Sequence, residues 1–438
     1  MLLQNTVMKI QKSNPISAFG GMNFVLDHLT KSSLDRLLDD SLPSLAPQSK
    51  YSWNDILYSL LSIYLCGGDC IEDLQTHLRG HFTNNPYLSM PSSDTVLRRI
   101  GSLSAPTNTC KTKRGSVLHA YNTNSVLERL NIKLLERLGA FRQEELVLDY
   151  DNTIIFNEKK DSKMTYKRAP GYQPGVCTIN ENQVLYIENR NGNSDAKSFQ
   201  ADTLSRLFDL LGASGVCKAD HFRADAASYQ HDVVRLLHKK VKHFYIGCRN
   251  GYVEKYFRDV KSWAATFDTD NSAIEVGEVM VTPFERQAKN DNQAPREYRL
   301  VVKRSLKSTK QIDAFTNDAY QYRAILTNNF TLDAVELAEF YNHRGNMERQ
   351  FDILKNDFGW GSMPFSDLGK NTAFLYLTAI CRNLYCHIIE YFSAKCKTLR
   401  PSYRVKKFLF RFIILPSKWV ERSRQKQLRV YGDIHFET

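Results

Sequence analysis

The sequence lacks the features of a secreted or membrane-spanning protein. Its first residues, MLLQNTVMKIQKSNP, contain neither the cationic start, the long apolar run nor the cleavage site of a signal peptide. The longest apolar stretch, residues 371–392, is interrupted by four polar side chains, Arg382, Asn383, His387 and Glu390. Such a stretch is typical of a buried core helix rather than a membrane span. We therefore expect no membrane partner and a cytoplasmic location.

A pattern of paired cysteines is also missing. The nine cysteines are odd in number, scattered and mostly inside apolar runs, which indicates reduced, intracellular usage. One group, Cys66, Cys70, His77 and His81, has side chains that suit zinc. The gap between Cys70 and His77 is far shorter than in known zinc motifs, so we interpret these residues as structural and expect no zinc site.

Acidic residues are fewer than basic ones, and the formal net charge is +12. Twelve Lys and Arg stand against three acidic residues from Lys395 to the C-terminus. A basic C-terminal region of this kind, residues 395–438, is typical of proteins that contact a polyphosphate or an anionic membrane surface, and we predict phosphate contacts for it. Lys406 and Lys407 are its leading candidates for DNA contact. A solvated basic face is the alternative.

The chain is long enough, at 438 residues with 42% hydrophobic content, for two or three domains with real cores. Helical patterns from Ser32 to Leu103 and a polar, basic linker at 104–124 predict a helical N-terminal domain over residues 1–124. Its last helix carries Arg98 and Arg99, which would contact DNA if the unit were a helix-turn-helix reader. A packing or dimerisation bundle is the alternative.

Strands and helices alternate over residues 125–250, which predicts an α/β fold with a mixed sheet. The segment LVLDYDNTIIF places Asp149 and Asp151 on one strand face, where unpaired carboxylates are costly. Asp225 closes the segment FRAD directly before a helix, the position at which open α/β sheets carry active groups. Asp220 is a weaker candidate because it lies farther from that junction.

Residues 251–320 predict a β-rich insertion, and residues 321–394 predict the second part of the core. A helix expected over Tyr341–Phe358 presents Tyr341, Arg344, Glu348 and Lys355 within roughly a 60° arc. Beside this arc runs an apolar stripe, Phe340, Met347, Phe351, Leu354 and Phe358. The arc suits a site that binds a metal and a polyanion together, whereas the simpler reading is a surface helix with an Arg344–Glu348 ion pair.

Three carboxylates thus occupy positions from which one site could form: Asp151 (or Asp149), Asp225 and Glu348. Carboxylates are the oxygen ligands that Mg²⁺ prefers, and two such ions support phosphodiester chemistry by activating an attacking oxygen and stabilising a leaving one. Arg344 and Lys355 would hold the phosphate backbone beside them.

Four features together resemble the DDE transposases of bacterial insertion sequences. They are the carboxylate order, the segment LDYDNT, the segment FRADAASY, and the Y-x2-R-x3-E-x6-K spacing that KNDFGW completes. More narrowly, they resemble the cut-and-paste group that bears the Y-R-E-K signature. The resemblance covers roughly residues 53–431 and implies a ribonuclease-H-like catalytic core interrupted by the β-rich insertion.

The resemblance implies that Asp151, Asp225 and Glu348 bind two Mg²⁺ ions, with Mn²⁺ as a substitute and Asp149 as the alternative first ligand. It implies DNA contacts by Tyr341, Arg344 and Lys355 at the transposon end. The implied activity is metal-dependent cleavage at inverted-repeat ends, often through a hairpin, and strand transfer into target DNA. A homodimer on double-stranded DNA, in a bacterial nucleoid, would perform it.

Two other functions stay open at this stage. One is a catalytically silent DNA-binding repressor derived from a transposase, and the other is a metal-dependent nuclease of the same fold. Trp263, within the insertion, is a candidate for stacking on a flipped base, and a core tryptophan is the alternative.

Overall fold

The computed structural model describes residues 16–111, 117–216, 219–306 and 320–432. The chain forms two compact units. The first comprises residues 1–39, 44–97 and 388–438, and the second comprises residues 40–43 and 98–387. The finer boundaries expected near residues 124, 250, 320 and 394 stay a prediction. No helix in the described part of the chain is long and apolar enough to cross a membrane.

The first unit is built mainly from helices, in agreement with the helical patterns read from the sequence. Its helix α3 is buried on almost every side because apolar residues cover its whole circumference. A capping box of Ser52 and Asp55 starts this helix. Its regular elements are α1 (Gly21–Lys31), most of α2 (Leu34–Ser41), α3 (Trp53–Leu65), the first half of α4 (Ser93–Ser102), α13 (Val405–Phe408), β15 (Ser417–Arg422) and β16 (Gln425–Val430).

The second unit is organised around one large mixed sheet, which confirms the predicted α/β class. Its strand order is β1-β2-β8-β7-β3-β9-β10-β14-β13-β12-β11, and only β3, β9 and β10 run parallel to one another. The strands are β1 (Asn108–Lys111), β2 (Leu118–Asn122), β3 (Val147–Asn152), β7 (Gly175–Ile179), β8 (Gln183–Arg190), β9 (Ala219–Ala224), β10 (Val241–Cys248), β11 (Ala264–Phe267), β12 (Ala273–Val281), β13 (Tyr298–Leu306) and β14 (Tyr320–Thr327).

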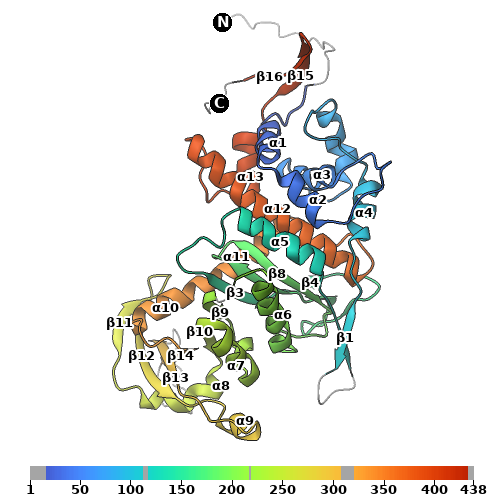
Figure 1. Cartoon of the computed structure of the whole chain (residues 1–438). Helices are drawn as coiled ribbons and strands as arrows, with labels where there is room; N and C mark the ends of the chain where they lie inside the picture. Colours follow the sequence, from blue (N-terminus) through green and yellow to red (C-terminus); the bar gives the residue numbers. More distant parts are fainter. Residues whose placement is uncertain (1–15, 112–116, 217–218, 307–319, 433–438) are drawn as a thin grey trace, which may run out of the picture. The chain divides into compact units, whose positions relative to one another are not determined.

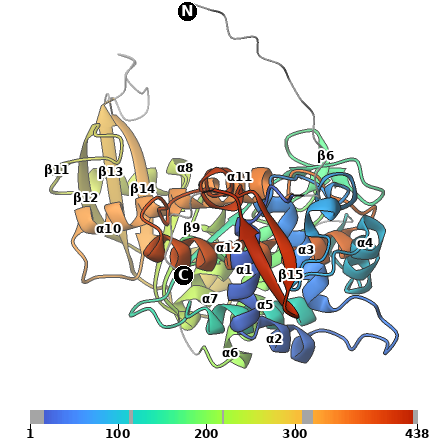
Figure 2. The same ribbon diagram turned by 90° about the horizontal axis from the view of Figure 1, so that it is seen from above.

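The strands expected within residues 251–320 are present and extend this sheet instead of forming a separate one. Strand β13 pairs with β14 and with β12, and β12 pairs with β11. Figure 2 shows β12, β13 and β14 side by side, with α10 (Ala334–Asn342) packed against them. Two short helices, α8 (Asn250–Val253) and α9 (Glu285–Asn290), lie in the same segment.

The two faces of the central strands differ in chemistry. Leu148, Tyr150 and Phe222 belong to an apolar cluster that includes α6 (Gln200–Ala213) and α7 (His231–Lys240). Because successive residues of a strand alternate, Asp149 and Arg223 point to the opposite face. That face lies beneath α10 and α11 (Asn346–Asp357), whereas α6 and α7 cover the other (Figure 1). Polar groups are thereby gathered under the predicted functional helix.

Strand β8 is fixed by side chains from two helices. Asn131 of α5 (Ser125–Arg137) donates from Nδ2 to the Val184 and Leu185 carbonyls. On α12 (Leu368–Lys395), Asn383 accepts the Val184 N–H, and the Tyr376 hydroxyl contacts the Ile187 backbone. These bonds satisfy buried polar groups, as a core of this size requires. They also explain one of the polar residues that interrupt the long apolar stretch, Asn383.

The segment LVLDYDNTIIF does not form one continuous strand. Strand β3 ends at Asn152, and Ile155–Phe156 forms β4 in a separate three-stranded sheet with β5 (Lys163–Met164) and β6 (Pro170–Tyr172). Strand β6 approaches β4 very closely, because a Cβ on Gly171 would lie 2.5 Å from the Ile155 carbonyl oxygen. Glycine at this position allows the second sheet to form.

Glu128 provides a test of packing in the second unit. Its Oε1 accepts the Asn124 N–H at the start of α5, and only 8% of the residue is exposed. Burial, opposed by that hydrogen bond, raises the pKa of Glu128 to about 7 from an ordinary 4.5. Between these values the folded protein holds a proton that the unfolded chain has lost, so stability falls as pH rises.

We therefore expect Glu128→Gln, which keeps the acceptor oxygen, to gain stability over the parent protein as pH rises from about 4.5 to about 7. The gain reaches up to about 3 kcal/mol and stays constant at higher pH. Urea unfolding followed by circular dichroism measures it. Glu136→Gln, at an exposed position of the same helix, is the control. A pH-independent difference between Glu128→Gln and the parent would contradict the expectation.

Candidate active site

Asp151 and Asp225 come together because the strands that carry them are parallel neighbours. In the register of β3 and β9, Tyr150 lies opposite Ala224, so the two aspartates follow at the same sheet edge. Carboxyl ends of adjacent parallel strands are where α/β proteins place functional groups. The Asp225 carboxylate accepts the Ala227 N–H at 3.0 Å, which starts the 3₁₀ turn Ala226–Ser228.

Asp151 lies among charges of both signs. Arg344 donates from Nη1 to its Oδ2 at 3.2 Å, and the two side chains are 19% and 18% exposed. Burial, together with the nearby Asp225 and Glu348 charges, raises the pKa of Asp151 to about 7, although Arg344 opposes this rise. The electrostatics therefore place both other predicted carboxylates near Asp151.

The charges around Arg344 also indicate that Asp151, Asp225 and Glu348 lie near one another. Its burial disfavours the charge, yet Tyr341, Asp151, Asp225 and Glu348 together raise the pKa of Arg344 above its ordinary value. The Arg344 guanidinium thus pairs with Asp151 and lies within electrostatic range of Asp225 and Glu348. Such an excess of negative charge is stable when a further cation shares the site.

The helix expected over Tyr341–Phe358 is interrupted. Helix α10 ends at Asn342, a 3₁₀ turn spans His343–Gly345, and α11 continues to Asp357. The interruption occurs at Gly345, where the absence of a side chain weakens the helix. Tyr341, Arg344 and Glu348 therefore lie on three successive segments, so the prediction of one continuous helix is wrong at this turn.

The apolar side of this region is as expected. Met347, Phe351, Leu354 and Phe358 are buried. Lys355, on the same helix, is half-buried, and burial lowers its pKa. Glu348 is exposed. One edge of α11 therefore packs into the core, and Glu348 stays accessible.

A buried arginine ties the sheet to this helical region. The Arg223 side chain is fully buried and binds both oxygens of Asp149, each at 2.7 Å. It also donates to Glu181 at 2.9 Å and to the Phe340 carbonyl at 2.8 Å. Because that carbonyl is near the end of α10, the cation also faces the negative end of the helix dipole.

Glu181 extends the network from the sheet to the 3₁₀ turn. Its oxygens contact Asn346 Nδ2 at 2.8 Å and His343 Nδ1 at 3.2 Å. Partial burial disfavours its charge, but Arg223 and His343 lower the pKa of Glu181 below its ordinary value. The residues on both sides of Arg344 are thereby fixed to the sheet. Neither Arg223 nor Glu181 was among the predicted site residues.

Tyr341 is held against the end of β9. Its hydroxyl donates to the Ala224 carbonyl at 3.1 Å, directly before Asp225. Gly247 of β10 makes room for it, because a Cβ there would lie 2.4 Å from the hydroxyl oxygen. A DNA contact by this hydroxyl therefore requires exchange of its bond to Ala224.

The segment KNDFGW has a clear structural role. Gly359 adopts φ +76°, a left-handed conformation that ends α11. The Trp360 N–H bonds to the Leu354 carbonyl, and its indole N–H bonds to Thr378 of α12 at 2.9 Å. Trp360 is fully buried. This segment fixes the far end of the helix that carries Glu348 and Lys355.

The competing aspartates have structural partners. Both Asp149 oxygens are bound to Arg223, and Asp220 accepts the Leu146 N–H at 2.9 Å. Asp151 and Asp225 each use one oxygen for a neighbouring backbone N–H. The carboxyl edge of the sheet thus offers Asp151 and Asp225 to a ligand, whereas Asp149 is bound through both oxygens and Asp220 lies at the opposite end of β9.

The remaining predicted residues lie outside this site. Arg98 is exposed on α4, and Lys406 and Lys407 are exposed on α13. Arg99 is half-buried. The Trp263 ring is covered by the Arg304 guanidinium at 4.0 Å.

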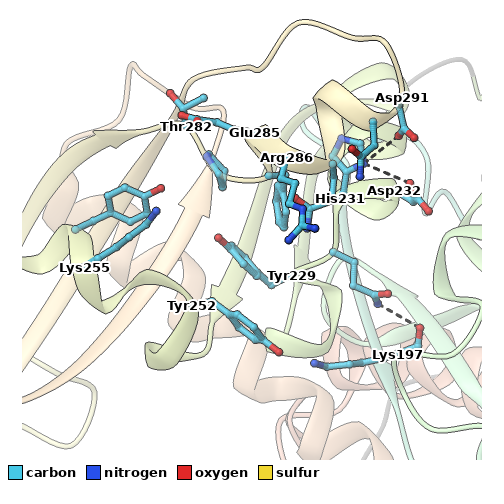
Figure 3. Close-up of a pocket in the computed structure, with 16 residues that line it drawn as sticks. Lys197, Tyr229, His231, Asp232, Tyr252, Lys255, Thr282, Glu285, Arg286 and Asp291 are labelled. Atoms are coloured by element: carbon cyan, nitrogen blue, oxygen red, sulfur yellow. Dashed lines mark hydrogen bonds and ion pairs between the residues drawn. The ribbon is translucent and has the colours of Figure 1, made fainter.

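A cleft of about 970 Å³ opens a few residues beyond Asp225. Figure 3 shows Tyr229 and Tyr252 on one side of it and His231 with Asp232 and Asp291 on another. Among the described residues, this His–Asp–Asp cluster is the only group of three potential metal ligands whose atoms all lie within 4.8 Å of one another. Both carboxylates face one imidazole nitrogen, at 3.5 and 3.4 Å, and Arg235 contacts Asp291, which is the geometry of an ion-pair cluster.

The ligand oxygens of Asp151, Asp225 and Glu348 are therefore not all within that distance of one another. Their chemistry nevertheless suits a divalent ion, because three carboxylates share one arginine and mutual repulsion acts on Asp151. Binding one shared ion requires the three side chains to move closer together.

The spacing of Cys66, Cys70, His77 and His81 predicts no zinc site, and one of these residues has another partner in the structure. His81 accepts the Ala18 N–H through Nδ1, and Cys66 is buried. All eight cysteines in the described part of the chain are free thiols. This agrees with the expected reduced state.

The fold and site define an α/β protein with an acidic site at the carboxyl ends of its parallel strands. Residues 14–432 match the family described as Transposase DDE domain group 1. Because this match spans nearly the whole chain, the protein belongs to that transposase family. No curated protein matches the sequence. A solved structure, "Mos1 transposase paired-end complex with left transposon end", aligns with 50% of this chain and 76% of its own at 13% identity. Its TM-score of 0.16 is too low to support an argument.

The Arg223 network generates a stability prediction. Arg223→Met leaves Asp149 buried without its cation, so we expect a loss of about 3–5 kcal/mol in the free energy of unfolding. The double variant Arg223→Met/Asp149→Leu should recover part of this loss because the unpaired charge is gone. Urea unfolding of the full chain measures both variants.

Arg235→Met is the matched control, since its partner Asp291 is 45% exposed. Such a surface pair contributes about 1 kcal/mol or less. Equal losses for Arg223→Met and Arg235→Met would show that the buried network does not stabilise the fold.

Proposed function

We propose that this transposase cleaves DNA at the ends of its element and joins the freed end to target DNA, in a metal-dependent reaction. The observation that carries the proposal is the convergence of Asp151, Asp225 and Glu348 around Arg344. Membership of the transposase family supports the same function. The narrower assignment to the Y-R-E-K group of bacterial insertion sequences rests on the sequence spacing.

Asp151 is the first carboxylate of the proposed triad. Asp149 already binds Arg223 through both oxygens, and removing it from that pair would leave a buried cation without its bidentate partner. Asp151 instead shares its environment with Asp225 and Glu348. We therefore assign Asp149 a structural role and Asp151, Asp225 and Glu348 the catalytic one.

Arg344 would orient the scissile phosphate. Its guanidinium already lies among the carboxylates, and arginine binds phosphate oxygens through a bidentate fork. The network of Arg223 and Glu181 limits its movement, since it fixes the neighbouring residues His343 and Asn346. Lys355, farther along α11, would contact the next part of the backbone as a point charge.

The three carboxylates would hold two divalent ions, Mg²⁺ by preference with Mn²⁺ as a substitute. When bound, such ions lower the pKa of an attacking water or hydroxyl and stabilise the leaving oxygen. The protein's own residues supply the orientation: the parallel strands place Asp151 and Asp225, and the helical region places Glu348. A proton from the attacking group would leave to solvent along the exposed side of Glu348.

The partner is double-stranded DNA, as both inverted-repeat ends and target, and the active form would be a homodimer. Exposed cations suited to phosphate contacts are Lys406, Lys407 and Arg98, and Arg99 lies beside Arg98. Tyr341 would contact DNA at the active site itself. A silent repressor or a nuclease that never joins strands would bind the same DNA. A silent repressor would not cleave this DNA, and a nuclease of that kind would cleave it without joining the freed end to target DNA.

We expect Asp225→Asn and Glu348→Gln each to reduce cleavage of end-containing DNA by at least about 100-fold, because each removes a charge from the metal site. DNA carrying the element's own flanks, incubated with Mg²⁺, provides the assay, and joined products are scored separately. Asp352→Asn, at an exposed position one turn from Glu348, is the control and should cleave normally. Unchanged cleavage in Asp225→Asn would remove the proposed triad.

Divalent ions should also stabilise the protein without DNA. We expect Mn²⁺ to raise the thermal unfolding midpoint, because an ion that binds only the folded state stabilises it. Asp151→Asn should abolish this increase, whereas Asp232→Asn, in the His–Asp–Asp cluster of the cleft, should keep it. Loss of the increase only in Asp232→Asn would place the main ion site in that cleft instead.

A further inference from the structure

The β15–β16 hairpin has one face whose cations have no partner within the described residues. It carries five cations, Lys418, Arg422, Arg424, Lys426 and Arg429, and one acidic residue, Glu421. Residues directly opposite one another in the register share a face. One face therefore presents Trp419, Leu428, Glu421 and Lys426, and the other presents Lys418, Val420, Arg422, Gln425, Gln427 and Arg429.

The first face is anchored within its own unit. The Trp419 indole N–H donates to Asn23 of α1 at 3.0 Å, and its ring meets Tyr87 edge to face. Ser17 pairs with Ser417 at the base of the hairpin. These contacts hold a two-stranded ribbon that would be only marginally stable alone. In Figure 1 the hairpin extends from the end of α1.

The second face places like charges together. Lys418 lies directly opposite Arg429, an arrangement that destabilises a strand pair. Arg422 follows on the same face, and Arg422 and Arg429 are exposed. Within the described residues, none of these three cations has an ion-pair partner. An anionic partner would relieve this repulsion.

The turn is also unusual. Ser423 and Arg424 have φ values of +52° and +63°, the left-handed conformation of a two-residue hairpin turn. Asn and Gly favour this turn, so an arginine at its second position is not there for backbone reasons. The tip sequence Arg422-Ser423-Arg424-Gln425 has no apolar side chain that could enter a lipid surface. The ribbon therefore suits a polyanion better than a membrane.

We propose that the β15–β16 hairpin is a DNA-reading ribbon that enters the major groove of duplex DNA. The groove is about 12 Å wide and admits a two-stranded antiparallel ribbon. The second face of the hairpin is the outward face that would meet the bases. On it, the Arg422 and Arg429 side chains can bind guanine edges, and the Gln425 and Gln427 side chains can bind adenine edges. Lys418 would contact the flanking phosphates. The proposal takes only its partner, duplex DNA, from the proposed function, and it needs none of the catalytic roles.

The proposal is tested by letting the full-length protein select duplexes from a random-sequence pool. EDTA is present so that no DNA is cleaved. We expect the protein to enrich a motif, and Gln425→Ala/Gln427→Ala to lose part of it. Affinity for the enriched duplex should fall roughly 5- to 150-fold for each bidentate contact that is lost. The salt slope of binding should not change, because no charge is removed.

Arg429→Gln and Lys426→Gln form the matched pair, because each removes one cation from opposite faces of the same strand. Arg429→Gln should weaken binding and alter the motif, whereas Lys426→Gln should leave the motif intact. Arg422→Gln provides a second variant of the outward face, and thermal unfolding checks that all variants fold. Equal effects of Arg429→Gln and Lys426→Gln would reduce the hairpin to a diffuse basic surface and overturn the proposal.

Two further outcomes would also overturn it. One is an unchanged motif in Gln425→Ala/Gln427→Ala. The other is Arg429-dependent binding to phosphatidylserine vesicles without an effect on DNA, which would make the ribbon a membrane contact. A failure of any kind here leaves the cleavage assay unaffected, so the two proposals are tested separately.

Discussion

The buried pair of Arg223 and Asp149 is the interaction on which the site depends. A guanidinium with no exposure to solvent is stable only when its hydrogen bonds and charge are matched. Asp149, Glu181 and the Phe340 carbonyl together meet that requirement. The same three contacts join β3, the β7–β8 turn and α10. A single side chain thereby fixes the sheet edge relative to the segment that carries Arg344 and Glu348.

This arrangement separates structural from reactive carboxylates along one strand. Asp149 and Asp151 are two residues apart and share a face, so their local sequence does not distinguish them. The difference comes from register: Arg223 lies opposite Asp149, and no equivalent cation lies opposite Asp151 in β9. Asp149 is therefore neutralised inside the fold, and Asp151 remains at the strand end with Asp225. Burial and the neighbouring Asp225 charge raise the pKa of Asp151, although Arg344 opposes this rise.

The sequence was sufficient for features set by local periodicity and strand order. The mixed sheet, the position of Asp225 at a strand end and the apolar side of α11 all follow from alternation and helical spacing. The 3₁₀ turn at His343–Gly345 did not follow, because its backbone stays in the right-handed helical region and one glycine is a weak signal. The pairing of Ile155–Phe156 with β6 did not follow either, because it depends on the close approach of Gly171, which comes later in the chain.

The position of Arg223 in the sequence already indicates a buried ion pair. Arg223 stands between the apolar residues Phe222 and Ala224 of β9, and alternation directs it to the face that carries Asp149. An arginine in such a position implies a buried carboxylate on the neighbouring strand. Glu181 gave no comparable signal, since it lies in a turn and reaches its partners only after β7 and β8 pair. Charged residues inside apolar strands therefore indicate how a site is supported, whereas strand ends indicate where its reactive groups lie.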